Sequence, residues 1–252
     1  MTKQEVTRQR VLELIEQLAV GDPIPPERRL AGELGVSRLT LRAALDELAR
    51  EGLIVRRRGS GSFVSEPKIA QQIGLTSFTE DMRRRSMTPG TRLVEMETIH
   101  AGARLGRALH VSPGDQVVRV LRLRLADGEP MAVEDLYVTA SLIPGLTRAD
   151  LENASFYALL RERYGITVAR GIQVIEPTVT SQQEASLLGV PLHSPALMFE
   201  RTTQSDDGTI VEFVRSVYRG DRYRIVTELS PPVSGQPEIV RAIDANGVSF
   251  TS

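Results

Sequence analysis

Two arginines, Arg122 and Arg124, stand two residues apart in the run RVLRLRLA. The run has the two-residue period of a β-strand, so both guanidinium groups fall on one face of the predicted strand. Like charges at this spacing repel one another unless a carboxylate or an anionic ligand lies between them. The pair therefore indicates anion binding, and the alternative is a structural network in which Glu134 or Glu212 neutralises it.

Both glutamates lie on the second strands of predicted hairpins, whose turns are Asp127-Gly128 and Asp207-Gly208. Glu134 follows its turn glycine by six residues and Glu212 follows its own by four, and because both offsets are even, the two carboxylates have the same facing. Tyr218 continues the face of Glu212. We expect one face of an antiparallel sheet to offer two arginines, two carboxylates and a tyrosine.

Two predicted helix starts, in the runs TSFTEDM and SFYALL, supply further polar groups. Hydroxyl groups and free backbone N–H groups at such positions bind phosphate well. Each also has a purely structural explanation, since Ser77 with Glu80 forms a capping box and Ser155 is a plain N-cap. The candidate ligand-binding residues from these segments are Thr76, Ser77, Phe78, Thr79, Ser155 and Tyr157.

A second kind of chemistry is predicted near the N-terminus. The stretch ERRLAGEL has apolar residues at helical spacing, and Gly35-Val36-Ser37 supplies a turn and an N-cap for the next helix. That helix places Arg38 and Arg42 on a face away from its leucine stripe. This is the pattern of a helix-turn-helix whose second helix enters the DNA major groove.

A basic wing is predicted after these helices. Two short strands, at 53–57 and 62–64, surround Gly59-Ser60-Gly61. A single surface arginine is usually a solvated charge, but the whole spaced set favours DNA contact. The candidate DNA-binding residues are Arg28, Ser37, Arg38, Thr40, Arg42, Arg58, Gly59, Ser60 and Gly61.

Composition limits the remaining possibilities. The 252 residues, 41% of them hydrophobic, are enough for two domains, and the net charge is −1. The chain has no cysteine, and its three histidines show no metal-ligand spacing. Its first residues contain no apolar signal core or membrane span. We expect a soluble cytoplasmic protein that does not contact membranes, with no cofactor, no metal and no catalytic residue, because no nucleophile has an evident base beside it.

The run IPPERRLAGELGVSRLTLRAAL and the later GSGSFV resemble the winged helix of the GntR family of bacterial transcription regulators. The resemblance implies that Arg28 lies near a phosphate or a base edge, and that Arg38, Thr40 and Arg42 touch DNA. It also implies that the wing tip, with Gly59 and Gly61, enters the minor groove.

The remaining chain resembles the UTRA effector domain of the HutC branch, through LTSFTEDM, RLRLADGEPMAVE, SFYALL and VEFVRSVYRGDRY. These motifs are most similar to the amino-sugar-responsive DasR and NagR type, which implies an amino-sugar phosphate such as N-acetylglucosamine 6-phosphate or glucosamine 6-phosphate as effector. Phosphate would be held by Thr76, Ser77, Phe78, Thr79, Arg122, Arg124, Ser155 and Tyr157, and the sugar by Glu134, Glu212 and Tyr218. The alternatives are a different sugar or small acid, or a lyase-like enzyme, since the UTRA fold is similar to chorismate lyase.

The predicted fold is α+β, with a winged helix-turn-helix at 1–65, a linker at 66–75, a chorismate-lyase-like antiparallel-sheet domain at 76–230 and a tail of unknown role at 231–252. The predicted function is that of a regulator, most readily a repressor. It would bind a palindromic double-stranded DNA operator as a homodimer and respond to a small anionic effector.

Overall fold

The computed structural model describes residues 3–57, 60–65, 68–72, 74–152, 155–227, 243–244 and 247–248. The chain divides into two compact units, which are described separately. One comprises the chain up to Gln71 together with Arg219–Ile225, and the other comprises Gln72–Tyr218 and the chain from Val226 onward. The domain limits proposed from the sequence stay predictions.

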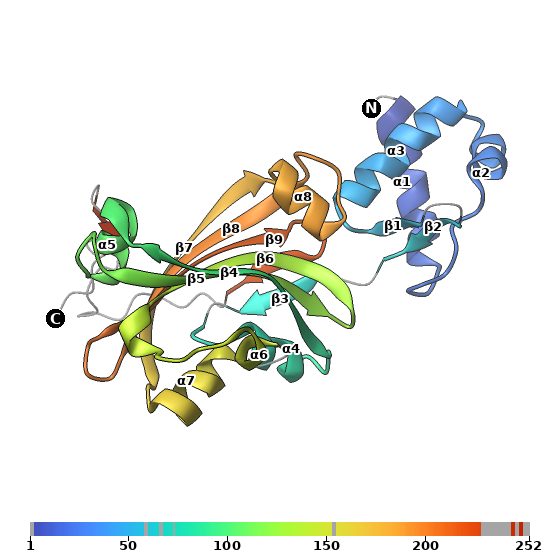
Figure 1. The fold of residues 1–252 in the computed structure, drawn as a ribbon. Helices are drawn as coiled ribbons and strands as arrows, with labels where there is room; N and C mark the ends of the chain where they lie inside the picture. Colours follow the sequence, from blue (N-terminus) through green and yellow to red (C-terminus); the bar gives the residue numbers. More distant parts are fainter. Residues whose placement is uncertain are drawn as a thin grey trace, which may run out of the picture. The chain divides into compact units, whose positions relative to one another are not determined.

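The first unit begins with three helices, α1 (Lys3–Glu16), α2 (Glu27–Leu34) and α3 (Arg38–Arg50), shown in blue in Figure 1. The apolar faces of the three helices meet in one core, which includes Val11, Leu30, Leu41, Leu45 and Leu48. Burial of these aliphatic side chains is the main favourable term that holds the short helices together.

The turn between α2 and α3 has the predicted chemistry. Gly35 adopts a left-handed conformation with φ 64° and ends α2, a conformation that costs glycine little. Ser37 caps α3, and its hydroxyl accepts a hydrogen bond from the backbone N–H of Thr40 at 3.0 Å. This cap fixes where the first turn of α3 begins and how its side chains are directed.

A two-stranded antiparallel hairpin follows, formed by β1 (Ile54–Arg57) and β2 (Gly61–Val64). Its position agrees with the predicted wing, although Arg58 and Gly59 lie outside the described residues. A further strand, β3 (Ile69–Gln72), pairs with β10 (Tyr223–Val226). The sequence indicates only a linker around β3, because the run SEPKIAQQIGL shows no clear period.

The second unit is built on a six-stranded sheet in the order β4-β5-β6-β9-β8-β7. Its strands are β4 (Pro89–His100), β5 (Gln116–Ala126), β6 (Glu129–Thr139), β7 (Val168–Val179), β8 (Pro195–Ser205) and β9 (Ile210–Arg219). Its helices are α4 (Phe78–Arg84), α5 (Gly102–Leu109), the 3₁₀ turn η1 (Ala140–Leu142), α6 (Arg148–Leu151), α7 (Phe156–Tyr164) and α8 (Gln182–Leu188). The predicted α+β class with an antiparallel sheet is confirmed.

Helices cover both faces of this sheet. Figure 1 shows α4, α6 and α7 below the sheet and α8 above it. Leu151 of α6 and Leu160 of α7 pack on Val120 and Leu136 of the lower face. Leu188 of α8 packs on the opposite face. The strands therefore alternate between two apolar layers, as the two-residue period requires.

The two hairpins of the sheet have different turns. Asp127 and Gly128, with φ values of 50° and 82°, join β5 directly to β6, which is the φ pattern of the favoured two-residue hairpin turn. Between β8 and β9 the loop is longer, and Asp207 accepts hydrogen bonds from the Ser205 hydroxyl and the Thr209 N–H. Each hairpin follows a short helix, α5 or α8, so the weak internal repeat of helix and hairpin is confirmed.

Within the described residues, no helix is long and apolar enough to cross a membrane. In the predicted tail, two short strands, β11 (Ile243–Asp244) and β12 (Gly247–Val248), pair with each other. The rest of the tail lies outside the described residues.

A substitution at Leu136 tests how much the packing of the core beneath α6 and α7 stabilises the domain. Its side chain is fully buried, so Leu136→Ala removes apolar contacts and leaves a cavity, at an expected cost of about 2–5 kcal/mol of unfolding free energy. Urea unfolding followed by tyrosine fluorescence measures it, because all five tyrosines lie between 137 and 223. The matched control is Leu192→Ala, at a side chain that is 54% exposed, with an expected change within about 0.5 kcal/mol. Equal stabilities of the two variants would contradict the packing described.

Candidate functional site

The predicted ligand-binding residues of the sheet lie on one face. In the register of β5, β6 and β9, Arg122 is opposite Glu134, which in turn is opposite Ser216. One pair further along, Arg124 is opposite Ala132, and Ala132 is opposite Tyr218. The prediction from the sequence that these side chains lie on the same face of the sheet is therefore correct.

Arg122 and Glu134 form a buried ion pair across β5 and β6. Burial alone would raise the pKa of Glu134, but the charges of Arg122 and Arg124 outweigh it and hold that pKa below its usual range. Arg122 is only 4% exposed, and its Nε and Nη1 atoms are buried with no hydrogen-bond acceptor among the described residues. Buried donors without an acceptor are costly in proteins.

Arg124 is held by a different set of partners. Its guanidinium donates hydrogen bonds to the hydroxyls of Thr91, at 2.7 Å, and Thr79, at 3.1 Å. The same group lies over the ring of Phe78, 4.6 Å from its centroid, where cation–π attraction adds to the hydrogen bonds. Phe78 and Thr79, both predicted at the start of α4 as ligand-binding residues, therefore contact the predicted arginine Arg124.

The starts of α4 and α7 meet at this face. Ser77 caps α4 in a capping box with Glu80, and Ser155 caps α7. The hydroxyl of Ser155 also donates a hydrogen bond to that of Ser77 at 3.2 Å, and both residues are buried. The structural explanation of both serines therefore holds, and the two caps nevertheless bring their hydroxyls together beside the arginines.

Tyr157 and Glu212 join the two halves of the predicted site. The phenol of Tyr157, from α7, donates a hydrogen bond of 2.6 Å to Oε1 of Glu212 on β9. Burial raises the pKa of Glu212, and the positive charge of Arg201 opposes that rise only in part. Burial also raises the pKa of Tyr157 well above its ordinary value, with the charge of Glu212 acting in the same direction. Tyr157 therefore remains a neutral donor at neutral pH.

Arg201 of β8 was missed by the sequence analysis. Its Nη1 donates to the backbone carbonyl of Thr76 at 3.3 Å, and its Nη2 lies 3.9 Å from Oε1 of Glu212. Its guanidinium is 5.7 Å from the centre of the Tyr157 ring. The internal repeat offered a signal, because β8 corresponds to β5, the strand that carries Arg122, in the second hairpin.

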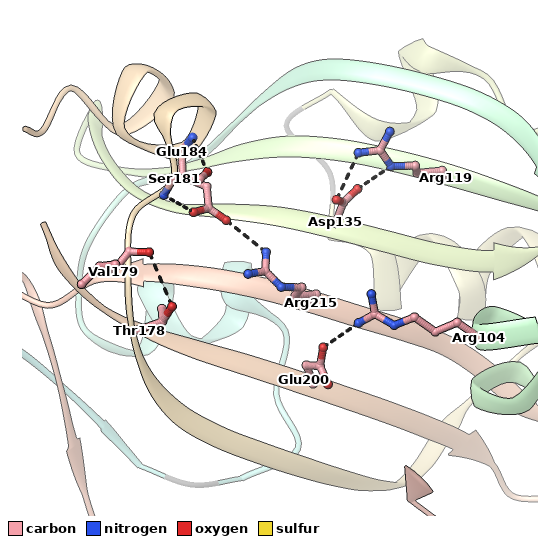
Figure 2. Close-up of polar contacts among 9 residues, drawn as sticks. All are labelled: Arg104, Arg119, Asp135, Thr178, Val179, Ser181, Glu184, Glu200 and Arg215. Atoms are coloured by element: carbon pink, nitrogen blue, oxygen red, sulfur yellow. Dashed lines mark hydrogen bonds and ion pairs between the residues drawn. The ribbon is translucent and has the colours of Figure 1, made fainter. Parts of the chain in front are cut away.

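The opposite face of the sheet also carries arginines, but in a different setting. Figure 2 shows Arg119 bound to Asp135, Arg215 bound to Glu184 and Arg104 bound to Glu200. These side chains are partly or largely exposed, from 23% for Arg119 to 69% for Arg104. Each arginine has a carboxylate beside it in partial contact with water, which is the ordinary state of a surface charge. The burial of Arg122 and Arg124, which are 4% and 3% exposed, distinguishes the two faces.

The buried face suits an anion rich in oxygen atoms. It holds the buried guanidinium groups of Arg122 and Arg124, and the partly buried one of Arg201, against the carboxyl groups of Glu134 and Glu212. Among the described residues, Nε and Nη1 of Arg122 and Nε of Arg201 are buried without an acceptor. Among the described residues there is no group of three or more acidic or histidine side chains that would hold a metal ion.

The predicted DNA-binding arginines of the first unit differ in whether a carboxylate lies beside them. Arg28 of α2 and Arg38 at the start of α3 are exposed. Arg42, by contrast, pairs with Glu27 at 3.0 Å, and Arg56 of the wing pairs with the same carboxylate at 3.3 Å. Glu27 thus lies among the basic residues, which the sequence analysis did not predict, and ties the second turn of α3 to the wing.

The remaining DNA-binding candidates lie at the cap and the wing. The hydroxyls of Ser37 and Thr40 are 2.8 Å apart and hydrogen-bonded to each other. Ser60 is exposed, and Gly61 begins β2 with φ 105°, a conformation open to glycine because it has no Cβ. Arg58 and Gly59 lie outside the described part of the chain, so their placement stays a prediction.

Comparison with known proteins defines the class. Residues 3–64 match the family described as "Bacterial regulatory proteins, gntR family", and residues 84–224 match the UTRA domain. The chain belongs to the GntR family and combines its DNA-binding head with a UTRA domain, as the sequence motifs indicate. The UTRA match begins after the start of α4, so Thr76, Ser77 and Thr79 lie outside it.

Individual relatives agree with this. The chain is 40% identical to the "HTH-type transcriptional repressor NagR" of Bacillus subtilis, over 81% of this chain and 84% of the relative. It is 34% identical to the "HTH-type transcriptional repressor PhnF" of Mycolicibacterium smegmatis, over 87% and 89%. The crystal structure of PhnF from Mycobacterium smegmatis has a TM-score of 0.64 and 32% identity, covering 90% of this chain and 100% of that one. These relatives are named as transcriptional repressors and not as enzymes, and this chain is a DNA-binding transcription regulator of the GntR family.

A substitution at Glu134 tests how much its ion pair with Arg122 stabilises the fold. Glu134→Gln leaves Arg122 without its counter-charge, at an expected cost of about 3 kcal/mol. The pKa of Glu134 is lowered in the folded state, so its contribution to stability is complete above the unfolded-state pKa. That contribution is lost as the pH falls through the lower, folded-state value.

Urea unfolding between about pH 3 and pH 7 measures this effect. The unfolding free energy of the Glu134→Gln variant should depend less on pH at the acid end than that of the wild type. Glu176→Gln, at an exposed residue of β7, is the control and should follow the wild type. A full wild-type acid dependence in the Glu134→Gln variant would contradict the assigned pairing.

Proposed function

We propose that this protein is a homodimeric transcriptional repressor whose affinity for a palindromic operator is lowered by a phosphorylated amino sugar, with N-acetylglucosamine 6-phosphate or glucosamine 6-phosphate as the effector. The observation that carries the effector class is the buried face of β5, β6, β8 and β9, where three arginines outnumber two glutamates. A phosphate dianion supplies charged acceptors for the buried donors of Arg122 and Arg201 that have none among the described residues.

The two ends of such an effector have different partners on this face. The phosphate group is assigned to Arg122, Arg124 and the hydroxyls at the starts of α4 and α7, which already meet there. The sugar hydroxyls and the acetamido group are assigned to Glu134, Glu212 and Tyr218, because carboxylates accept hydrogen bonds from hydroxyl and amide donors. A neutral ligand would offer the buried donors of Arg122 only uncharged acceptors, which form weaker hydrogen bonds.

Operator binding is assigned to the exposed start of α3 and to the wing. Two copies related by a two-fold axis would place two α3 helices in major grooves about one helical turn apart. The segment Thr76–Thr79 directly follows the predicted linker 66–75 in the chain. Effector binding at this segment would therefore act on the strand that leads to the DNA-binding head, and change the spacing or angle of the two heads.

The direct test of the effector is a thermal-melting screen of the purified full-length protein. N-acetylglucosamine 6-phosphate and glucosamine 6-phosphate should raise the melting temperature in proportion to the logarithm of their concentration. In a gel shift, the same compound should release operator DNA selected from a random pool. A shift produced instead by another sugar or a small acid would replace the amino sugar while leaving the regulator intact.

Arg38 tests the DNA-binding surface. Arg38→Ala should weaken operator binding by about 10-fold to 100-fold, since a bidentate arginine contact to guanine is worth about 1–3 kcal/mol. The effector affinity should not change. Arg50→Ala removes an exposed arginine from the other end of the same helix and should change operator affinity less than about threefold. Equal effects of the two substitutions in gel shifts would show that only general charge matters.

Arg124 tests the phosphate assignment. Arg124→Ala removes a buried cation and frees Thr79 and Thr91, so calorimetry should show at least about a 100-fold loss of sugar-phosphate affinity. Arg104→Ala, on the opposite face, should bind the effector as the wild type does. Undiminished binding by the Arg124→Ala variant would refute this effector site.

A further inference from the structure

Arg201 has N–H donors directed toward both predicted halves of the effector site. It contacts Thr76 through its Nη1 and approaches Glu212 through its Nη2. Its guanidinium lies over the aromatic ring of Tyr157. Thr76 and Tyr157 are assigned to phosphate and Glu212 to the sugar, so Arg201 lies where the two assignments meet.

The guanidinium of Arg201 forms few hydrogen bonds with the described residues. A single hydrogen bond, to the carbonyl oxygen of Thr76, is formed at 3.3 Å. The 3.9 Å separation from Oε1 of Glu212 is longer than a hydrogen bond, and that oxygen already accepts from Tyr157 at 2.6 Å. The Nε atom is buried without an acceptor among the described residues. Most of the five N–H donors of this side chain are therefore available to another acceptor.

Arg122, on β5, also has buried N–H donors without an acceptor among the described residues. Its Nη2 is bound to Glu134, whereas its Nε and Nη1 are buried and unmatched within the described part of the chain. Glu134 and Glu212 both contribute to the electrostatic surroundings of Arg201, as do Tyr157 and Tyr218. The two arginines thus converge on one cluster from β5 and β8, and both have buried N–H donors without an acceptor among the described residues.

We propose that Arg201 is a further effector-binding residue, which together with Arg122 binds the anionic group of the effector and sets the preference for a phosphorylated over a neutral sugar. This inference rests on the proposed function and adds a third arginine to its phosphate site. A purely structural role, in which Arg201 only balances Glu212, predicts a different result in the experiment below.

The test compares Arg201→Met with Arg201→Lys in the full-length protein. Apparent dissociation constants for N-acetylglucosamine 6-phosphate and for N-acetylglucosamine are obtained from melting-temperature titrations. The Arg201→Met variant should lose about 30-fold or more in affinity for the phosphorylated sugar, and its ratio of affinities, phosphorylated over neutral, should fall at least about tenfold. The Arg201→Lys variant, which restores the charge without the planar fork, should recover at least about tenfold of the lost affinity.

Arg215→Met is the matched control, because it removes an arginine of the neighbouring strand that is bound to Glu184 on the opposite face (Figure 2). It should leave both affinities within about threefold of the wild type. If the Arg201→Met variant binds the phosphorylated sugar as tightly as the wild type, or loses affinity for both sugars by the same factor, the proposal is overturned. The second outcome is the one expected of a structural role.

A second comparison covers the case in which the Arg201→Met variant does not fold, because Glu212 would then be buried without a counter-charge. The double variant Arg201→Met with Glu212→Gln removes both charges and is compared with Glu212→Gln alone. The same loss of about 30-fold is expected between these two proteins, and equal affinities would overturn the proposal. If the wild type binds no phosphorylated sugar at all, the proposed effector is wrong, which is a different outcome from wild-type binding that survives the loss of Arg201.

Discussion

The effector domain depends on keeping five charged groups together on one face of its sheet, of which Arg201 is partly buried and the other four are buried. Isolated charges are expensive to remove from water, and a buried pair is tolerated only with close counter-charges and hydrogen bonds. Arg122 meets this condition through Glu134, and Arg124 meets it through Thr79, Thr91 and the ring of Phe78. The caps of α4 and α7, the pairing of β5 with β6 and the strand β8 bring the partners of these groups together.

The same constraint explains why the two faces of one sheet behave differently. Along β5, Arg119 and Arg122 differ by an odd number of residues and so point to opposite sides. Arg119 shares its charge with Asp135, Glu95 and Glu97 in partial contact with water. Its environment contributes little beyond an ordinary surface network. Arg122 has one carboxylate and no water-facing surface to compensate for unmatched donors.

Much of this arrangement followed from local sequence rules. The two-residue period placed Arg122, Arg124, Glu134 and Tyr218 on one face, and the Asp127-Gly128 turn fixed the register of the first hairpin. Arg201 was not placed in the same way, because the even-offset rule was applied only to β9, the second strand of the second hairpin, and Arg201 lies on its first strand, β8. The pairing of Arg42 and Arg56 with Glu27 was also missed. It joins residues 15 and 29 positions apart, and local periodicity does not report contacts of that range.

The two units share one design feature, a carboxylate that orients arginines from separate elements. In the head, Glu27 of α2 pairs with Arg42 of α3 and with Arg56 of β1, and so links the second helix of the helix-turn-helix to the wing. A preformed surface loses less conformational entropy on binding than a flexible one. In the effector domain, Glu134 pairs with Arg122, and Glu212 lies 3.9 Å from Arg201. These carboxylates leave buried N–H donors of both arginines without an acceptor among the described residues, and this difference from the head is the basis of the ligand site that we propose.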